Sequence, residues 1–344
     1  MLLSNYNQLT ACVHFKLSGV EPQVLLCYKL AMQKKKTLTI IIPTFNSEDY
    51  LSRTLECLKN QQTQNFSVLI IDDNSKDTTA KITKKFPTVH FFSKPKNIKK
   101  GAAASISYAL KKVATPYVAL IDSDTYLNSN WTDTMEKILK KEDIAGAPIL
   151  ADNQNGLVAY LAGLEIENRY GNLPVKVSHL STCNLAFRAP LVKDFVFDEN
   201  LYYAYDHQLS FYLKRNHIKF YLSKKTSCYH GNKNSLKNYL LQQYNITKNH
   251  TVLAKKMPRE ALGGDEISPN YLILQPPLTL LMFGAMFYNL NWALVFFVII
   301  LFLNHKFLIY LNKKTKTLLL LPAIGLIILR NLMWTFGFMK GLTK

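Results

Sequence analysis

The chain has 344 residues, with 42 lysines and arginines against 23 aspartates and glutamates, and therefore a net charge of +19. A hydrophobic content of 48% and an aromatic content of 12% exclude a disordered chain, and 13 glycines and 13 prolines exclude a collagen-like one. The length allows one large domain or two. Positive charge suits nucleic acid, anionic lipid or phosphorylated substrates, and the apolar C-terminal quarter favours a membrane-attached protein over a nucleic-acid-binding one.

The first 36 residues lack the basic cluster and apolar core of a secretory signal. Met32 stands just before the first clear strand, so we interpret residues 1–36 as an N-terminal extension and Met32 as the functional start. An amphipathic lead-in helix is the alternative. The five cysteines are scattered and no two have CxxC spacing, which fits a reducing compartment and argues against a zinc ribbon.

From Thr37 onward, short apolar runs alternate with segments of helical spacing. Strands are predicted at residues 37–43, 66–73, 89–94 and 116–122, and helices at residues 48–61, 75–86, 99–113 and 131–141. Strands that are apolar throughout and alternate with helices indicate a parallel sheet covered on both faces. Ligands of such sheets bind beyond the carboxyl ends of the strands, where this sequence places acidic and polar clusters.

The strongest cluster is Asp122-Ser123-Asp124, which follows the fourth predicted strand. Two carboxylates at positions i and i+2 project to the same side of an extended chain. At a strand end they can hold one hard divalent cation together with phosphate oxygens. Such pairs often only cap a helix, so it is the position in the alternation that favours a functional role.

Three further clusters follow the other strands. Asp72 and Asp73 end the second strand, where helix capping is the ordinary role of such acids. The turn Pro43-Thr44-Phe45-Asn46 leaves the first strand. Lys100 precedes a helix N-terminus that could meet phosphate, with a solvated turn as the alternative.

In this order and spacing, four segments resemble the family 2 glycosyltransferases of GT-A fold: IIIPTFNSEDYLSRTLECLKNQ, VLIIDDNSKDTT, NIKKGAAASISYAL and YVALIDSD. The resemblance covers roughly Thr37 to Lys256. It implies a Rossmann-like α/β domain with a mostly parallel central sheet, a nucleotide-sugar donor, a divalent cation (Mg²⁺ or Mn²⁺), and inversion at the anomeric carbon. Carried over by position, it implies a donor site of Pro43, Thr44, Phe45, Asn46, Asp72, Asp73, Lys100, Asp122 and Ser123, and metal ligands Asp122, Asp124 and His230.

Three downstream segments extend the resemblance. STCNLAFR resembles the acceptor-side segment, which implies Asn184 and Arg188 there. YDHQL resembles the Glu-Asp element whose Asp is the catalytic base, which implies Asp206. The usual Glu is Tyr205 here, so Asp198 and Glu199 compete for this role. CYH resembles a later strand that often ends in a functional His. For His230, the role of a structural core histidine stays open beside that of a ligand.

QQYNITKNH lies where processive synthases carry a Gln-x-x-Arg-Trp motif. The Arg-Trp is absent, which disfavours extrusion of a long polymer. The sequence therefore predicts a non-processive enzyme within a catalytic domain at residues 37–256.

Residues 257–344 are strongly apolar and are predicted to form a membrane-associated helical tail. A span needs roughly 20 apolar residues. Residues 278–303 could cross once, or belong to a hairpin (about 272–303) that turns at Asn289–Asn291. The hairpin is favoured because it returns Lys306, Lys313, Lys314 and Lys316 to the cytoplasmic side. Arg330 is costly in a lone span, so the further segment, about 317–339, lies at the interface or packs against the hairpin. A buried helical core is the alternative.

These observations predict a membrane-anchored, metal-dependent, hexosyltransferase-like enzyme that moves a sugar from a nucleotide-sugar donor to a lipid-linked or cell-envelope glycan acceptor. Membrane lipids are expected partners and nucleic acid is not. The expected location is the cell membrane, multi-pass, with a cytoplasmic catalytic domain. One alternative is a polyprenyl-phosphate glycosyl synthase, whose anionic acceptor needs less base catalysis. Another is a non-catalytic basic protein that binds membrane surfaces, in which the acidic clusters would be incidental.

Overall fold

The computed structural model describes residues 36–261 and 264–344. The chain divides into two compact units, Met1–Lys36 and Thr37–Lys344, and the second is described here. The predicted N-terminal extension falls almost entirely on residues 1–35, outside the described residues.

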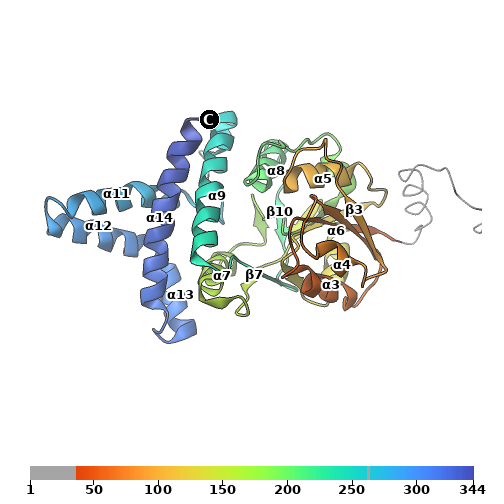
Figure 1. Cartoon of the computed structure of the whole chain (residues 1–344), viewed down its shortest axis with the longest axis horizontal. Coiled ribbons are helices and arrows are strands. Elements are labelled where there is room, and N and C mark those ends of the chain that lie inside the picture. The colour runs from red at the N-terminus through yellow and green to blue at the C-terminus, as the bar shows by residue number, and fades with distance from the viewer. Residues whose placement is uncertain (1–35, 262–263) are drawn as a thin grey trace, which may run out of the picture. The chain divides into compact units, whose positions relative to one another are not determined.

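An eight-stranded sheet lies at the centre of residues 37–256, the predicted catalytic part (Figure 1), with the strand order β3-β2-β1-β4-β9-β6-β10-β8. Its strands are β1 (Leu38–Thr44), β2 (Phe66–Asp72), β3 (Val89–Ser93), β4 (Tyr117–Ile121), β6 (Ile144–Gly146), β8 (Lys176–Val177), β9 (Asn184–Arg188) and β10 (Phe220–Leu222). Only β9 and β8 run antiparallel to their neighbours. The predicted α/β fold with a mostly parallel sheet is confirmed.

The helices that connect the first strands are α3 (Leu51–Lys59), α4 (Thr79–Thr83), α5 (Ala102–Leu110) and α6 (Trp131–Leu139). Helix α5 packs on β1 and β2, and α6 packs on β6 and β9. All residues of β2 are buried, as the continuous apolar run predicts. Helix α4 is shorter than predicted because Glu48 and Asp77 hold the preceding loop through hydrogen bonds of about 3.0 Å to the amides of Thr78 and Glu48.

A second, three-stranded sheet has the order β5-β11-β7, formed by β5 (Thr125–Leu127), β7 (Ile149–Ala151) and β11 (Cys228–His230). Strand β11 pairs antiparallel with β5, which sets His230 opposite Thr125. This pairing brings the end of β11 beside the tip of β4. The other elements of the middle segment are α7 (Gly156–Gly171), the 3₁₀ turn η2 (Ala189–Val192) and α8 (Tyr205–Arg215).

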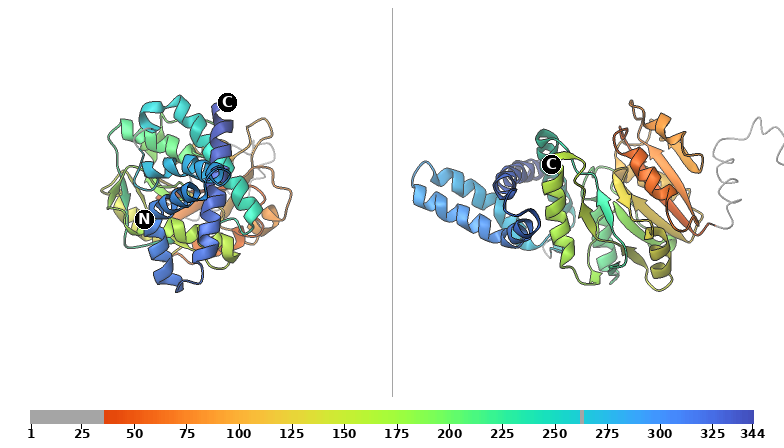
Figure 2. Two further views of the ribbon diagram at one scale, coloured as in Figure 1. Left: turned by 90° about the vertical axis from the view of Figure 1, so that its left-hand side faces the viewer. Right: turned by 90° about the horizontal axis from the view of Figure 1, so that it is seen from below.

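The C-terminal part is helical: α9 (Leu236–Lys256), α10 (Pro258–Ala261), η3 (Asn270–Leu274), α11 (Gln275–Ala285), α12 (Leu290–Leu303), α13 (His305–Thr315) and α14 (Leu320–Leu342). Helices α9 and α14 lie side by side along most of their length (Figures 1 and 2). Glycine permits this close approach, since a Cβ on Gly341 would lie 2.8 Å from the carbonyl oxygen of Lys248.

Helices α11 and α12 form the predicted hairpin, with 11 and 14 residues. Neither reaches the roughly 20 residues that a span needs. Among the described residues, only α14 is long and apolar enough to cross a membrane alone, and α12 with α13 would qualify only as one span bent by 68°. The predicted multi-pass topology is therefore not supported.

Arg330 of α14 points into the protein, where it is almost fully buried. Its guanidinium pairs with Glu165 of α7, donates to Gln275 Oε1 at 2.8 Å, and lies 4.3 Å from the centre of the Trp334 ring. Burial alone would raise the pKa of Glu165, but Arg330 and Arg169 outweigh it and lower that pKa to about 2. Of the two expected placements of Arg330, packing against the base of the hairpin matches the structure.

Candidate active site

The segment Asp122–Asp124 links β4 to β5 and is held by backbone and hydroxyl contacts. The Asp122 amide donates to Cys183 O at 3.4 Å, and the Thr125 amide donates to Asp122 O at 3.1 Å. The Ser123 hydroxyl lies 2.9 Å from that of Ser47, in the loop after β1. The two neighbouring strand ends are thus tied together at the carboxyl edge of the sheet, where a parallel sheet binds its ligand.

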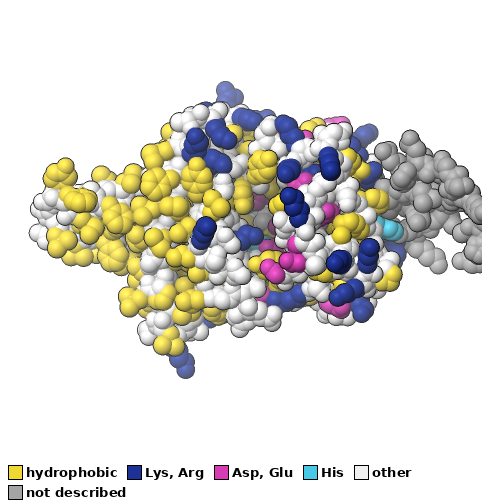
Figure 3. All heavy atoms as spheres, in the orientation of Figure 1, with side chains coloured by type: hydrophobic (Ala, Val, Ile, Leu, Met, Phe, Trp, Pro, Cys, Tyr) yellow, Lys and Arg dark blue, Asp and Glu magenta, His cyan; other side chains and the backbone are white. Residues whose placement is uncertain are grey.

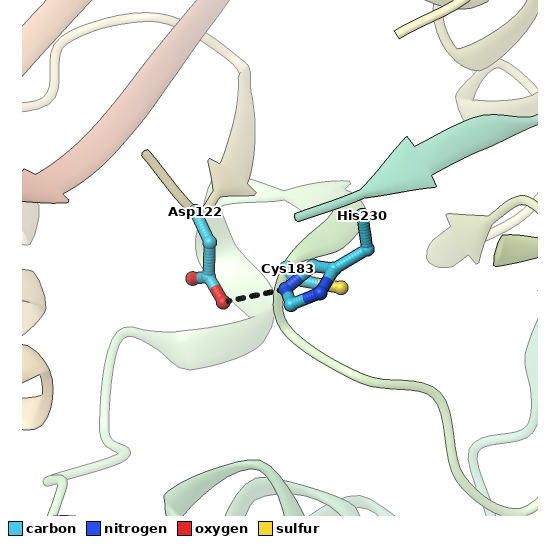
Figure 4. Close-up of side chains that lie close together, drawn as sticks. All are labelled: Asp122, Cys183 and His230. Carbon is cyan, nitrogen blue, oxygen red and sulfur yellow. Dashed lines mark ion pairs between the residues drawn. The ribbon is translucent and has the colours of Figure 1, made fainter. Parts of the chain in front are cut away.

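His230 reaches the two carboxylates from β11. Its Nε2 lies 3.4 Å from Asp124 Oδ1 and 3.9 Å from Asp122 Oδ2. Figure 4 shows Asp122, Cys183 and His230 converging, and one ligand atom from each lies within 4.8 Å of the others. Gly231, which follows His230, packs closely here, because a Cβ at this position would lie 3.1 Å from Asp124 Cβ.

The charges at this cluster influence one another strongly. Burial raises the pKa of Asp124, and Asp122 adds to that shift while His230 opposes it. For His230, burial lowers the pKa, but Asp124 and Asp122 outweigh it and raise the pKa to about 9. Burial also raises the pKa of Cys183 well above its usual value, so this side chain stays a thiol. The two carboxylates suit Mg²⁺ or Mn²⁺, and the imidazole of His230 could join them as a ligand once it has lost its proton.

Asp72 and Asp73 lie at the next strand end, and both have partners inside the protein. Asp72 Oδ2 accepts from the Ser75 amide at 3.0 Å. Asp73 forms a buried ion pair with Lys94 at 2.8 Å and accepts from the Gly101 amide, at the start of α5, at 2.6 Å. The loops around the predicted donor site are therefore ordered by these acids, and direct contact with a nucleotide stays a prediction.

The turn after β1 presents Phe45 to solvent, with 54% of the residue exposed, whereas Thr44 is buried. Asn46 has a positive φ of 47° and its Oδ1 accepts from the Lys76 amide at 2.9 Å. Pro43 is half-buried and Lys100 is exposed. An exposed aromatic ring beside the end of β1 suits stacking on a nucleotide base.

The two predicted acceptor-side residues, Asn184 and Arg188, are the first and last residues of β9. Asn184 is buried, and its amide group accepts from Trp131 Nε1 and donates to Ala147 O, both at 2.6 Å. In the ladder between β4 and β9, Arg188 lies opposite Tyr117 at the start of β4. Tyr117 is four residues from Ile121, and this spacing corresponds to ~13 Å along a strand. Their side chains therefore join β9 to its surroundings, and the structure does not bring Arg188 to the carboxylates.

Asp206, the predicted base, is in the first turn of α8 with its side chain 22% exposed. Its carboxylate contacts His207 Nδ1 at 3.2 Å and faces His179 Nε2 at 3.9 Å. Although burial raises the pKa of Asp206, His207 and then His179 and His250 lower it well below its usual range. The group is thus ionised at neutral pH, but so low a pKa makes it a weaker proton acceptor than a base whose pKa lies near the operating pH.

His207 lies between two carboxylates, because its Nε2 is 3.3 Å from Asp265 Oδ2. Burial lowers its pKa, but Asp206 and Asp265 outweigh it and raise the pKa to about 10. The rings of His179 and His250 lie 3.9 and 4.2 Å from that of His207. The charge on His207 adds to burial and lowers the pKa of His250 to about 3, so His207 is the cation of this cluster.

We predict that Asp265→Asn lowers the pKa of His207 from about 10 towards its ordinary 6.5. A raised pKa stabilises the fold fully below 6.5 and loses this effect as pH rises through about 10. The melting temperatures of wild type and variant should therefore converge above that pH. Nuclear magnetic resonance of the His207 ring gives the pKa directly, and Glu266→Gln, which removes a neighbouring charge, is the control. A pKa near 6.5 for His207 in the wild type would contradict the proposed effect of Asp206 and Asp265 on this ring.

An open cavity of about 390 Å³ lies between the catalytic part and α13. Arg53, Asp152, Tyr229 and Lys314 are among its lining residues. Arg53 pairs with Asp152 at 2.6 Å and stacks 3.7 Å from the centre of the Tyr126 ring. The buried Tyr126 also lies beside Gly231, so its ring separates Arg53 of the cavity from the residue that follows His230. Aromatic rings, amides and charges together suit a sugar or a phosphate.

The sequence did not single out Cys183, His179, His207, His250 or Asp265 as members of these clusters. Cys183 immediately precedes β9, whose antiparallel pairing with β4 brings Asn184 opposite Ile121. The histidines come from separate segments of the chain. Only His207 had a local signal, since it follows Asp206 directly.

Comparison with known proteins shows what this chain resembles. The sequence model "Glycosyl transferase family 2" matches residues 39–195. The teichoic acid poly(glycerol phosphate) polymerase of Staphylococcus epidermidis is 31% identical over 175 residues, which are 48% of this chain and 24% of that protein. The chondroitin synthase of Pasteurella multocida is 27% identical over 235 residues, which are 64% of this chain and 23% of that protein. The chain thus spans about a quarter of the length of these relatives.

Among solved structures, the mannosyltransferase PcManGT of Pyrobaculum calidifontis, in complex with GDP-Man and Mn²⁺, superimposes with a TM-score of 0.56. It is 14% identical, and the match covers 90% of this chain and 94% of that one. A fragment of S. aureus TarS matches with a TM-score of 0.50 at 17% identity, over 89% of this chain and 92% of that one. Residues 39–195 therefore match the family 2 glycosyltransferase model, and the fold is of the GT-A type.

Proposed function

We propose that this protein is an inverting, hexosyltransferase-like enzyme that moves a sugar from a nucleotide-sugar donor to a hydroxyl of a lipid-linked or cell-envelope glycan. The observation that supports this most is the convergence of Asp122, Asp124 and His230 at the carboxyl end of β4. Asp122 and Asp124 lie within residues 39–195, which the family 2 model matches. Donor complexes of fold neighbours add support, since PcManGT was solved with GDP-Man.

Asp122, Asp124 and His230 would hold a divalent cation. Bound there, Mg²⁺ or Mn²⁺ would stabilise the negative charge on the departing nucleoside diphosphate. Phe45 offers a face for the nucleotide base, and Lys100 is an exposed cation near the start of α5. The Ser47–Ser123 contact links the loop that would hold the base to the segment that would hold the diphosphate.

Asp206 would accept the proton of the acceptor hydroxyl. The hydroxyl oxygen forms a bond to the anomeric carbon on the face opposite the diphosphate, the bond from carbon to diphosphate oxygen breaks, and the proton passes to Asp206. Tyr205 stands where the family usually has Glu, and its hydroxyl is hydrogen-bonded to Thr182. Burial raises the pKa of Tyr205 most, and the charges of Asp122 and Asp206 raise it further. This phenol is therefore within electrostatic reach of both carboxylates, which supports a shared site.

The acceptor would enter from the side of the helical tail. The 390 Å³ cavity includes Lys314 of α13, so a glycan or phosphate there would be held between the catalytic part and the apolar tail. Attachment of that tail to the cytoplasmic face of a membrane would keep the enzyme beside lipid-linked acceptors. It would also leave the donor site on the side where nucleotide sugars are made.

A donor screen tests the proposal. Purified protein is incubated with a panel of nucleotide sugars, Mn²⁺ and a membrane lipid extract, and release of nucleoside diphosphate is measured against an Asp122→Asn variant. We expect one donor class to be consumed, faster with the extract than without it, and product length shows whether one sugar or many are added. Release no greater than that of the variant for every donor would contradict a transferase. Vesicle binding without release would favour the non-catalytic binding protein.

A further inference from the structure

We propose that the α11–α12 hairpin inserts into the hydrocarbon of one leaflet of a bilayer while α14 lies along the membrane surface. The protein would then attach to one face of the membrane without crossing it. This inference rests on the membrane attachment proposed above and not on the transfer chemistry.

The hairpin exposes apolar side chains on nearly all of its sides. At its tip, Phe287, Tyr288 and Leu290 are 88%, 92% and 72% exposed. In α12 only Ala293 and Ile300 are buried, seven residues apart on one narrow stripe. Figure 2 shows the hairpin projecting from the other helices, and Figure 3 shows hydrophobic side chains covering it. A helix that packs on a protein partner along one side keeps a polar face toward solvent. A helix that is apolar on all sides therefore suits lipid better.

Charge is absent from the hairpin and resumes at its base. No Asp, Glu, Lys or Arg occurs between Glu266 and Lys306. Lys306, Lys313 and Lys316 of the following segment are exposed. Lysines at this boundary can contact anionic headgroups, each contributing about 1 kcal/mol near such a surface.

The length of the hairpin fits one leaflet. At 1.5 Å per residue, the 11 residues of α11 and the 14 of α12 extend ~16 and ~21 Å. The hydrocarbon of a bilayer is ~30 Å thick, so one leaflet contributes ~15 Å, which α11 matches. The extra ~6 Å of α12 corresponds to the headgroup region on one side of the bilayer. The tip would therefore end near the middle of the bilayer.

The backbone of the tip is prepared for an apolar medium, where every polar group needs an internal partner. The amides of Phe287, Tyr288 and Asn289 donate to carbonyls of Gly284 and Ala285 at 2.8–3.2 Å. Asn289 Oδ1 accepts from the Asn291 amide at 2.9 Å and so caps α12. These four amides of the turn therefore have hydrogen-bond partners within the hairpin itself.

Helix α14 has a polar neighbour along one side, which argues against a lone span. It packs on α9 through Gly337 and Gly341, beside Lys248 and Thr251, and directs Arg330 inward to Glu165. Its other side exposes Leu321, Phe336 and Leu342. A helix of this kind fits the boundary between headgroups and acyl chains.

Flotation of the full chain with phosphatidylcholine–phosphatidylglycerol vesicles tests insertion. Phe287→Glu with Leu290→Glu should lower partition into vesicles at least ~100-fold, since a charge within hydrocarbon is costly. The control Val175→Glu with Val196→Glu adds the same charges at exposed apolar positions of the catalytic part and should float like the wild type. Unchanged flotation of the tip variant would overturn the proposal. Circular dichroism checks folding, and diphosphate release in detergent separates this result from the proposed chemistry.

Depth is measured with brominated lipids. The difference in quenched tryptophan fluorescence between the wild type and a Trp292→Phe variant gives the contribution of Trp292, which lies near the tip. We expect bromines near the middle of the bilayer to quench it most. Strongest quenching by bromines close to the headgroups, or quenching by an aqueous reagent trapped inside the vesicles, would overturn insertion into one leaflet. A tip variant that changes from dimer to monomer in solution and still floats would assign the surface to a second copy, and would overturn the proposal too.

Discussion

Replacing Asp124 with asparagine is expected to lower turnover at least ~10²-fold at a Mn²⁺ concentration that saturates the wild type, the scale for loss of one preorganised electrostatic element. Asp124 Oδ1 lies 3.4 Å from His230 Nε2. Asparagine keeps the size of the side chain, so it removes a charge from the cation site without opening a cavity. Release of nucleoside diphosphate over a Mn²⁺ titration measures the effect.

Asp133→Asn is the matched control for this variant. Asp133 lies on α6 in an exposed ion pair with Lys137 at 2.7 Å, and exposed pairs contribute little to stability. The same change of charge there should leave turnover unaltered. Partial recovery of Asp124→Asn at higher Mn²⁺ would support a ligand role, whereas full wild-type turnover in excess chelator would contradict any requirement for a cation.

The strands of the catalytic part could be predicted because their signals are local. The runs Ile40–Ile42 and Val68–Ile71 are apolar without interruption and lie in buried strands. Polar clusters directly after such strands then lie at one edge of the sheet, whatever the rest of the chain does. For this reason Asp122, Asp124 and the loop after β1 could be assigned to one region from sequence.

The partners of these residues could not be predicted, because they depend on pairings between distant segments. His230 meets Asp124 only because β11 joins β5, about 100 residues earlier in the chain. Because β9 runs antiparallel to β4, Asn184 at its start lies beside Ile121, whereas Arg188 at its end lies beside Tyr117 at the other edge of the sheet. Motif spacing alone carries no information on strand direction.

In the tail, hydrophobicity predicted the hairpin and its turn but not what the helices pack against. Helix α14 has the composition of a span, yet its Arg330 pairs with Glu165, 165 residues away. A buried charge of this kind must have a partner, which the sequence could not name. The approach of α9 and α14 likewise depends on two glycines, whose role appears only once the helices are side by side.

The Asp206→Asn variant is expected to bind the donor almost normally while transfer falls ~10²–10⁴-fold, the usual contribution of general-base catalysis. The carboxylate of Asp206 is kept ionised by His207 and its neighbours, and not only by a cation at Asp122 and Asp124. Donor affinity is measured by calorimetry, and transfer by diphosphate release with the lipid extract.

The variant also removes a partner of the His207 cation, so folding must be followed in parallel by thermal melting. Asp198→Asn is the control, because Asp198 is the rival base suggested by sequence. Its carboxylate is already engaged, pairing with Lys256 and accepting from the Asn200 amide at 2.9 Å. We expect Asp198→Asn to transfer sugar at nearly the wild-type rate.

The pattern of failure distinguishes the remaining assignments. A folded Asp206→Asn protein that transfers normally would show that the acceptor needs no base, because a phosphate is already anionic, and would favour a polyprenyl-phosphate glycosyl synthase. Loss of transfer in Asp198→Asn instead would move the base to that residue. Loss of donor affinity in Asp206→Asn would place Asp206 with the nucleotide or the cation. Only loss of transfer with retained donor binding and retained folding fits a base that acts on an acceptor hydroxyl.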